Sequence, residues 1–214
     1  MPEIQAVLLD SDGTIRNSVE VINDAIQYAF GQQGIHLTED DIRPYAHGLP
    51  AAHKAFGGDI PYEIIRDDYY RRQEETHHSI ELYPGVREAI VKIKHRGWQL
   101  GMVSSSSFVQ KSLKADGLFD YFDAVIGGTM VTRLKPDKEP VELTLSMLGC
   151  DRRRAVLAGD LDADIRAGKA AQLLATIGLT HGFGTREMLE TAGADHIIDS
   201  FAELIGILDI IGRR

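Results

Sequence analysis

Six short apolar runs, separated by amphipathic stretches, constrain the fold of this chain more than any other feature of its sequence. The runs have the length of strands, and stretches such as GVREAIVKIKHRG and ADIRAGKAAQ carry apolar residues at helical spacing. The runs are IQAVLLD, WQLGMVS, FDAVIGG, RAVLAGD, LLATIGL and DHIID. Strands that alternate with helices form a parallel sheet with helices on both faces. We therefore predict an α/β fold with three layers and a parallel sheet.

The segment of residues 15–84 follows a different pattern. It is polar, holds five of the eight histidines and contains no strand-like run. Helix starts are expected at Ser18 and at Thr38, where Asp41 completes a pair like a capping box, and PYEIIRDDYYRRQEE predicts a long helix. The breakers in LYPGV mark the return to the core. We predict a core of residues 1–14 and 85–214, and a small all-helical cap of residues 15–84 inserted after the first strand.

Charge and cysteine content exclude several classes of function. The 214 residues carry a formal net charge of -9, so the chain lacks the basic surface that a nucleic acid or an anionic membrane requires. The single cysteine, Cys150, excludes an intrachain disulfide. No signal peptide or membrane-spanning run is visible. We expect a cytoplasmic protein that acts on a small molecule; the sequence does not indicate an oligomeric state.

Reactive side chains directly follow several of the apolar runs. In a parallel sheet, ligands bind at the carboxyl ends of the strands, near the point where strand order reverses. The residues expected at this edge are Asp10, Asp12, Ser104, Lys135, Asp160 and Asp164. Clustered carboxylates repel one another, and Mg²⁺, which prefers carboxylate oxygens and water, removes that cost. An ammonium group does not coordinate a metal, so Lys135 and the Ser104 hydroxyl suit the oxygens of a phosphoryl group. The set predicts a phosphoryl-transfer site with a carboxylate nucleophile.

Four motifs, taken in order, resemble those of the haloacid dehalogenase superfamily. They are LLDSDGT, GMVS, Lys135 and AGDLDAD, and the resemblance covers essentially the whole chain, including the helical cap between the first two motifs. The chain looks most similar to the branch with phosphoglycolate phosphatases and β-phosphoglucomutases. One departure is Lys138, where these phosphatases usually carry a second proline. The resemblance implies a Rossmann-like core and a Mg²⁺-dependent phosphatase that acts on a small phosphate monoester.

The resemblance also implies a role for each motif residue. Asp10 would be the nucleophile that becomes an aspartyl-phosphate, and Asp12 the general acid and base. Ser104, its neighbour Ser105 and Lys135 would bind the phosphoryl oxygens. The metal ligands would be Asp10, Asp12 through its main-chain carbonyl, and Asp160, with Asp164 in support. Residues i and i+2 of an extended strand project to the same side, so Asp10 and Asp12 can flank one phosphorus. Thr14 is expected to orient Asp12.

Two other functions remain open. A sugar phosphomutase of the same superfamily would return the phosphoryl group to the sugar. Against it, the first motif ends in Thr14 rather than valine, and no histidine lies between Ile15 and Gln33, where such mutases carry one. A receiver-like phosphoacceptor switch, in contrast, would not release phosphate repeatedly as an enzyme does. Receivers are shorter, keep their acidic pair adjacent and have no helical insertion, so a hydrolase is favoured.

Several conspicuous residues receive a simpler interpretation. Ser107 is expected to cap the next helix, Cys150 to be partly buried, and His77 and His78 to lie on a solvated surface. GFGTRE is interpreted as a turn into a helix, because it lacks the lysine and the spacing of a phosphate loop.

The substrate is expected to be selected by the cap. The candidate contacts lie in RPYAHGLPAAHKAF and are Arg43, His47, His53 and Lys54. Because a Gly-Leu-Pro sequence occupies a similar place in phosphoglycolate-phosphatase-like members, phosphoglycolate or a small sugar phosphate is the first guess.

Overall fold

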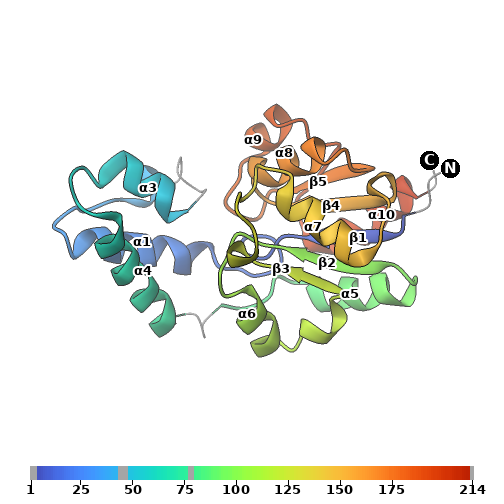
Figure 1. Cartoon of the computed structure of the whole chain (residues 1–214), viewed down its shortest axis with the longest axis horizontal. Coiled ribbons are helices and arrows are strands. Elements are labelled where there is room, and N and C mark those ends of the chain that lie inside the picture. The colour runs from blue at the N-terminus through green and yellow to red at the C-terminus, as the bar shows by residue number, and fades with distance from the viewer. Residues whose placement is uncertain (1–3, 43–47, 77–79, 213–214) are drawn as a thin grey trace. The chain divides into compact units, whose positions relative to one another are not determined.

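The computed structural model describes residues 4–42, 48–76 and 80–212 and divides into two compact units (Figure 1). The first unit comprises Met1–Arg16 and Leu82–Arg214, and the second comprises Asn17–Glu81. Each unit is described by itself below. None of the helices in the described ranges has both the length and the apolar character needed to cross a bilayer.

The first unit is built on a six-stranded parallel sheet, which confirms the predicted fold class. Its strands are β1 (Ala6–Leu9), β2 (Gln99–Val103), β3 (Ala124–Ile126), β4 (Ala155–Gly159), β5 (Ala175–Leu179) and β6 (His196–Ile198). Each apolar run of the sequence forms one of them. The order across the sheet is β3-β2-β1-β4-β5-β6, and every neighbouring pair is parallel. Strand order therefore reverses between β1 and β4, where a parallel sheet places its ligands.

Helices cover both faces of this sheet (Figure 1). Successive residues of β1 point to opposite faces, so Val7 and Leu9 enter one hydrophobic cluster while Ala6 and Leu8 enter the other. The first cluster includes side chains of α5 (Val86–His95), α6 (Val109–Ala115) and α10 (Leu204–Ile211); the second includes those of α7 (Glu139–Leu148) and α8 (Asp162–Ala170). Helix α9 (Arg186–Thr191) follows β5, and short 3₁₀ helices form at Phe119–Tyr121, Gly128–Met130, Arg152–Arg154 and Phe201–Glu203. The result is a three-layer, Rossmann-like core.

The second unit consists of helices joined by short loops in its described residues. Its helices are α1 (Val19–Gly31), α2 (Glu39–Ile42), α3 (Leu49–Phe56) and α4 (Tyr62–Thr76), and the last is the long helix predicted. They enclose their own apolar core, to which Phe30, Ile65 and Leu49 contribute. The predicted capping pair is confirmed, because Thr38 N donates to Asp41 Oδ2 (2.8 Å) and Asp41 N donates to Thr38 Oγ1 (3.2 Å). Helix α1 follows Ser18 as predicted, although the Ser18 side chain makes no capping hydrogen bond.

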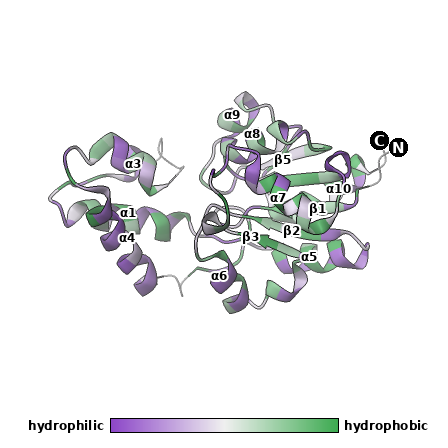
Figure 2. Cartoon of the chain, viewed as in Figure 1, coloured by the Kyte–Doolittle hydropathy of each residue, from purple (hydrophilic) through white to green (hydrophobic). Residues whose placement is uncertain are grey.

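The distribution of hydropathy matches this architecture. Figure 2 shows largely hydrophobic strands at the centre of the first unit and a mostly hydrophilic α4 in the second. All four residues of β1 are fully buried. The residues just beyond β1 are therefore held by a rigid, buried strand.

Candidate active site

Asp10 directly follows the central strand β1 and is 6% exposed. Its N–H donates to the carbonyl of Ala158 in β4 (3.0 Å), so the strand pairing extends to the residue itself. After Asp12 the chain turns sharply, because Ser11 O accepts hydrogen bonds from three later N–H groups, those of Thr14, Ile15 and Arg16. Gly13 makes this turn at φ +80°, a conformation that favours glycine. Asp12 is half-buried beside it.

Lys135 joins the first and fourth motifs. Its ammonium Nζ donates to Asp10 Oδ1 (2.6 Å), to Asp164 Oδ1 (2.6 Å) and to the carbonyl of Val103 (2.8 Å). The Lys135 side chain is 5% exposed. An ammonium has three N–H donors, and these contacts use all three. Burial lowers the pKa of Lys135, but the charges of Asp10 and Asp164 raise it by more, so the group stays protonated.

Asp160 is fully buried, and both of its oxygens accept hydrogen bonds. Thr14 Oγ1 donates to Asp160 Oδ1 (2.8 Å), and Phe183 N donates to Asp160 Oδ2 (2.8 Å). The Thr14 hydroxyl also lies 3.3 Å from Asp10 Oδ2. These contacts tie the first motif to the fourth, and the orientation of Asp12 by Thr14 stays a prediction.

Three glycines give Asp160 the space that it occupies. A Cβ atom added at Gly13, Gly182 or Gly184 would lie 2.4, 2.2 or 2.0 Å from an oxygen of Asp160. The first three residues of GFGTRE, which was interpreted above only as a turn into a helix, are therefore also part of the site. It does lead into α9, which Thr185 caps by accepting from Met188 N (3.2 Å). The signal that could have identified it is its position directly after β5, at the edge where the aspartates lie.

Asp164 is 1% exposed and lies in the first turn of α8. Its Oδ2 accepts a hydrogen bond from Leu161 N (3.0 Å), while its Oδ1 accepts from Lys135. Asp164 thus holds the loop after β4 and the lysine at the same time.

Three buried aspartates, Asp10, Asp160 and Asp164, form the group that can hold a metal ion within the described ranges. Each offers an oxygen, and these oxygens all lie within 4.8 Å of one another. Burial raises the pKa of Asp10 to about 7, against the lowering effect of Lys135, and burial together with Asp10 and Asp164 raises the pKa of Asp160 well above its ordinary value. Buried, mutually repelling carboxylate oxygens fit a hard divalent cation. The Asp12 side chain lies outside this group, which leaves its main-chain carbonyl as the expected ligand.

The serine loop after β2 holds the remaining predicted phosphate ligands. Ser104 is 4% exposed, and its Oγ accepts from Ser106 N (3.1 Å). Within the part of the chain that the structure describes, its hydroxyl proton has no acceptor, so it is available to a ligand. Ser105 is exposed. The prediction for Ser107 was wrong, because α6 begins at Val109 with Phe108 as N-cap. Phe108 N donates to Ser106 Oγ (3.2 Å), so Ser106 rather than Ser107 contacts the backbone at the helix start.

A buried arginine near Asp12 is a further feature that the sequence analysis missed. Arg16 is 4% exposed, and its Nε lies 3.6 Å from Asp116 Oδ2. Gly13 N donates to Arg16 O (2.9 Å), which fixes Arg16 to the turn of the first motif. Burial raises the pKa of Asp116, Arg16 and Arg87 lower it, and Asp12 raises it again. Arg16 therefore places a positive charge near the carboxylate of Asp116, which in turn lies close enough to Asp12 for their charges to interact.

Two of the four cap candidates can be located within the helical unit. The His53 Nε2 atom lies 2.7 Å from the carbonyl of Ile60, and its ring packs edge-on against Tyr62 at 5.3 Å. Lys54 is exposed. Arg43, His47, His77 and His78 lie outside the described residues. The His53 ring thus has a structural role in the unit.

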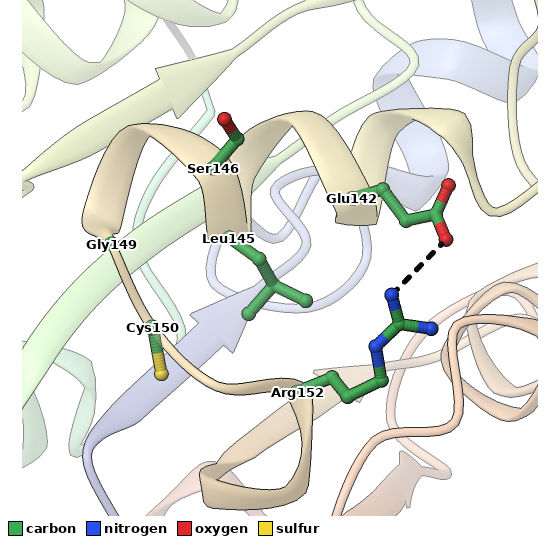
Figure 3. Close-up of a pocket in the computed structure, with 6 residues that line it drawn as sticks. All are labelled: Glu142, Leu145, Ser146, Gly149, Cys150 and Arg152. Carbon is green, nitrogen blue, oxygen red and sulfur yellow. Dashed lines mark ion pairs between the residues drawn. The ribbon is translucent and has the colours of Figure 1, made fainter.

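The pocket drawn in Figure 3 is separate from the acidic cluster. It lies where α7 leads into β4 and is lined by Glu142, Leu145, Ser146, Gly149, Cys150 and Arg152. These residues precede β4, at the amino ends of the strands, whereas the aspartates follow the carboxyl ends. Cys150 is half-buried, as expected, and burial raises the pKa of its thiol. The thiol is therefore protonated and a poor nucleophile.

Comparison with known proteins places these motifs in a family context. Residues 7–177 match the family model described as haloacid dehalogenase-like hydrolase. The pyrophosphatase PpaX of Listeria monocytogenes serotype 4b is 32% identical over 213 residues, which cover 96% of this chain and 97% of that protein.

Two solved structures resemble the chain over nearly its whole length. A predicted phosphoglycolate phosphatase from Haemophilus somnus 129pt superposes with a TM-score of 0.86 at 22% identity, over 97% of this chain and 99% of that one. CbbY from Rhodobacter sphaeroides, in complex with phosphate, superposes with a TM-score of 0.83 at 27% identity, over 96% and 99%.

Proposed function

This chain belongs to the family of haloacid dehalogenase-like hydrolases and is a phosphatase of that family; from this premise we propose that it hydrolyses a small phosphate monoester with Mg²⁺, through an aspartyl-phosphate on Asp10. The observation that carries the proposal is the buried cluster in which Lys135 contacts both Asp10 and Asp164, with Asp160 close by. A lysine, three buried carboxylates and a free serine hydroxyl at one sheet edge are the groups that phosphoryl transfer needs.

The roles of the residues follow from their chemistry. Asp10 attacks phosphorus through a carboxylate oxygen, and the bond to the leaving alkoxide breaks. Asp12 donates its proton to that alkoxide, then takes a proton from the water that hydrolyses the aspartyl-phosphate. The Ser104 hydroxyl, with Ser105 beside it, binds the phosphoryl oxygens, and Lys135 does so by exchanging one of its three present contacts for a phosphoryl oxygen.

The metal site of this proposal consists of Asp10, the main-chain carbonyl of Asp12 and Asp160, with Asp164 in support. Mg²⁺, when bound, neutralises negative charge on the phosphoryl oxygens and on the cluster. Thr14 and Phe183 hold Asp160 in place for this role. Lys135 keeps its charge beside Asp10, which favours the ionised nucleophile.

Phosphoglycolate and small sugar phosphates are the first substrates to test, and selection among them is assigned to the helical unit as a cap. Inorganic pyrophosphate is a second candidate, favoured by the 32% identical relative named as a pyrophosphatase. A phosphate leaving group is less basic than an alkoxide and needs less help from a general acid. The substitution Asp12→Asn should therefore lower the rate of the phosphorylation step less for pyrophosphate than for an alkyl phosphate.

A phosphate-release screen tests the proposal. Purified protein with Mg²⁺ is given phosphoglycolate, sugar phosphates, other metabolite monoesters and pyrophosphate, and released phosphate is counted per protein molecule. Many turnovers on at least one compound are expected. Release of no more than one phosphate per protein molecule across the panel would instead favour the phosphoacceptor switch.

The mutase alternative needs a separate experiment. A sugar phosphate that phosphorylates Asp10 is supplied with a trace of the sugar bisphosphate. Stoichiometric phosphate release is expected, because the first motif ends in Thr14 and water is the acceptor. Accumulation of an isomeric sugar phosphate with little free phosphate would identify a mutase.

A further inference from the structure

The loop after β5 contacts both the first motif and Asp160. His181 Nε2 lies 3.0 Å from the main-chain oxygen of Thr14, and because a carbonyl only accepts, Nε2 carries the hydrogen. Two residues later, Phe183 N donates to Asp160 Oδ2 (2.8 Å). The Thr14 hydroxyl closes the circuit by donating to Asp160 Oδ1 (2.8 Å). His181, Phe183, Thr14 and Asp160 thus form a closed ring of contacts.

Tyr83 fixes His181 from its other side. The Tyr83 and His181 rings stack with centroids 3.9 Å apart and planes 31° apart. The Tyr83 hydroxyl donates to the main-chain oxygen of His181 (3.0 Å). Tyr83 N in turn donates to the carbonyl of Ile15 (3.0 Å), the residue after Thr14. The imidazole plane and the loop backbone are therefore both held while the ring donates to Thr14.

This ring of contacts restricts the position of the Asp160 carboxylate. Thr14 is fully buried, so a main-chain carbonyl that loses its donor there is not resolvated by water. Gly182 lies against the Asp160 carboxylate and Gly184 against the Asp160 main-chain carbonyl, and neither position has room for a side chain. A shift of the loop that breaks the contact between His181 and Thr14 also displaces Phe183 N. This displacement weakens the hydrogen bond from Phe183 N to Asp160.

We propose that His181 is a positioning residue for Asp160. By donating to the Thr14 carbonyl, it holds the loop 181–184 in the position in which Phe183 N and the Thr14 hydroxyl donate to the two carboxylate oxygens of Asp160. The proposal rests on the proposed function in one respect, that Asp160 is a ligand of the divalent cation. Hydrogen-bond partners of ligating carboxylates orient the ligand, and their loss weakens metal binding.

Metal binding without substrate is the direct test. Mn²⁺ is titrated into the metal-free full-length protein, with free Mn²⁺ followed by electron paramagnetic resonance. His181→Phe keeps a ring to stack on Tyr83 but loses the N–H, and should raise the dissociation constant about 10- to 100-fold. His181→Gln keeps an N–H near the place of Nε2 and should bind Mn²⁺ nearly as wild type does. In a phosphatase assay, added Mg²⁺ should restore the activity of His181→Phe.

Thr185→Ala is the matched control, because Thr185 lies in the same connection but caps α9 through Met188 N. It should lower the melting temperature and leave the Mn²⁺ dissociation constant unchanged. If His181→Phe does not fold, Tyr83→Phe, which loses the hydroxyl contact to His181, should weaken Mn²⁺ binding.

The outcomes separate the two proposals. Wild-type affinity in His181→Phe, or in Tyr83→Phe when the former does not fold, overturns the positioning role alone. An equal loss of affinity in Thr185→Ala also overturns it. No Mn²⁺ or Mg²⁺ binding by the wild-type protein overturns the metal-dependent function and the positioning role together.

Discussion

At the scale of single residues, Lys135 controls the electrostatics of the acidic edge. Its one positive charge lies between Asp10 and Asp164, and all of these side chains are at least nine-tenths buried. Ion pairs of this kind depend on both partners, because a lone buried charge is strongly unfavourable. The lysine is therefore a stabilising group as well as a proposed ligand of phosphate.

Lys135→Met should lower the free energy of unfolding of the metal-free protein by ~3–5 kcal/mol, because it leaves buried carboxylates without their cation. Urea denaturation measures the change. Lys138→Met is the control, since Lys138 forms an exposed pair with Glu142 one helical turn away, and its loss should cost about 0.5 kcal/mol or less. Similar losses in the two variants would contradict a buried, interdependent cluster.

Asp10→Asn should reduce phosphate release on the order of 10⁴-fold or more, because an amide does not replace the attacking carboxylate. Circular dichroism should show an intact fold. Asp120→Asn, at an exposed position of the same unit, should keep full activity. Substantial turnover by folded Asp10→Asn protein would remove Asp10 from the role of nucleophile.

At the scale of elements, the start of α7 organises the connection that carries Lys135. The Glu139 carboxylate accepts from Thr132 N (2.8 Å), from Thr132 Oγ1 (2.8 Å) and from Arg133 N (3.1 Å). These hydrogen bonds lower the pKa of Glu139 to about 2. One carboxylate at a helix N-terminus thus fixes the loop that precedes the lysine.

Glu139→Gln should lower the melting temperature at pH 7, and the difference from wild type should shrink as the pH falls. The folded-state pKa lies below the ordinary 4.5, so the stabilisation is fully present above about 4.5 and is lost as the pH falls toward 2. Thermal scans at pH 7 and pH 3 check this. A difference that grows on acidification would show that the Glu139 charge does not stabilise the loop.

Local sequence patterns predicted the helices and strands. They did not predict the contacts between residues that are distant in the sequence. Each of the six strands is a continuous apolar run, and the capping pair of Thr38 and Asp41 spans four residues, so both are visible locally. The hydroxyl of Thr14 contacts Asp160, 146 positions away, and the GFG loop reaches Asp160 from the next strand. The contact of Thr14 leaves no local signature, and the GFG loop is marked only by its position directly after β5. The capping prediction for Ser107 was wrong although its signal was local, because the N-cap is Phe108 and the neighbouring Ser106 accepts the hydrogen bond from Phe108 N.

At the scale of the whole molecule, the chain has two units with separate hydrophobic cores. Every residue of the acidic cluster belongs to the first unit, and the candidate contacts for substrate selection belong to the second. If the proposed function is correct, substitutions in the second unit should change substrate selection and leave the acidic cluster intact. Metal binding in particular should act on the stability of the first unit alone.

Mg²⁺ should stabilise the folded protein and be required for turnover. At a concentration 100 times its dissociation constant, a ligand of the native state adds about 2.7 kcal/mol to the free energy of unfolding. Asp160→Asn should weaken this effect and raise the Mg²⁺ needed for activity, whereas Asp120→Asn should change neither. Ca²⁺ should support turnover poorly, because it accepts more oxygens in looser geometry. Full activity in a chelator would contradict the requirement.

The central place of β1 has a consequence for the order in which the chain folds. This strand is complete at Leu9, yet it pairs with residues 99–102 and 155–158. During synthesis the helical unit of residues 17–81 emerges with its whole core before either neighbour of β1 exists. Pairings between such distant segments form slowly, and unpaired apolar strands aggregate. A fully buried strand of the folded protein is thus the one that a nascent chain must shield longest. Any dependence on chaperones should therefore arise from the late pairing of the sheet rather than from the helical unit.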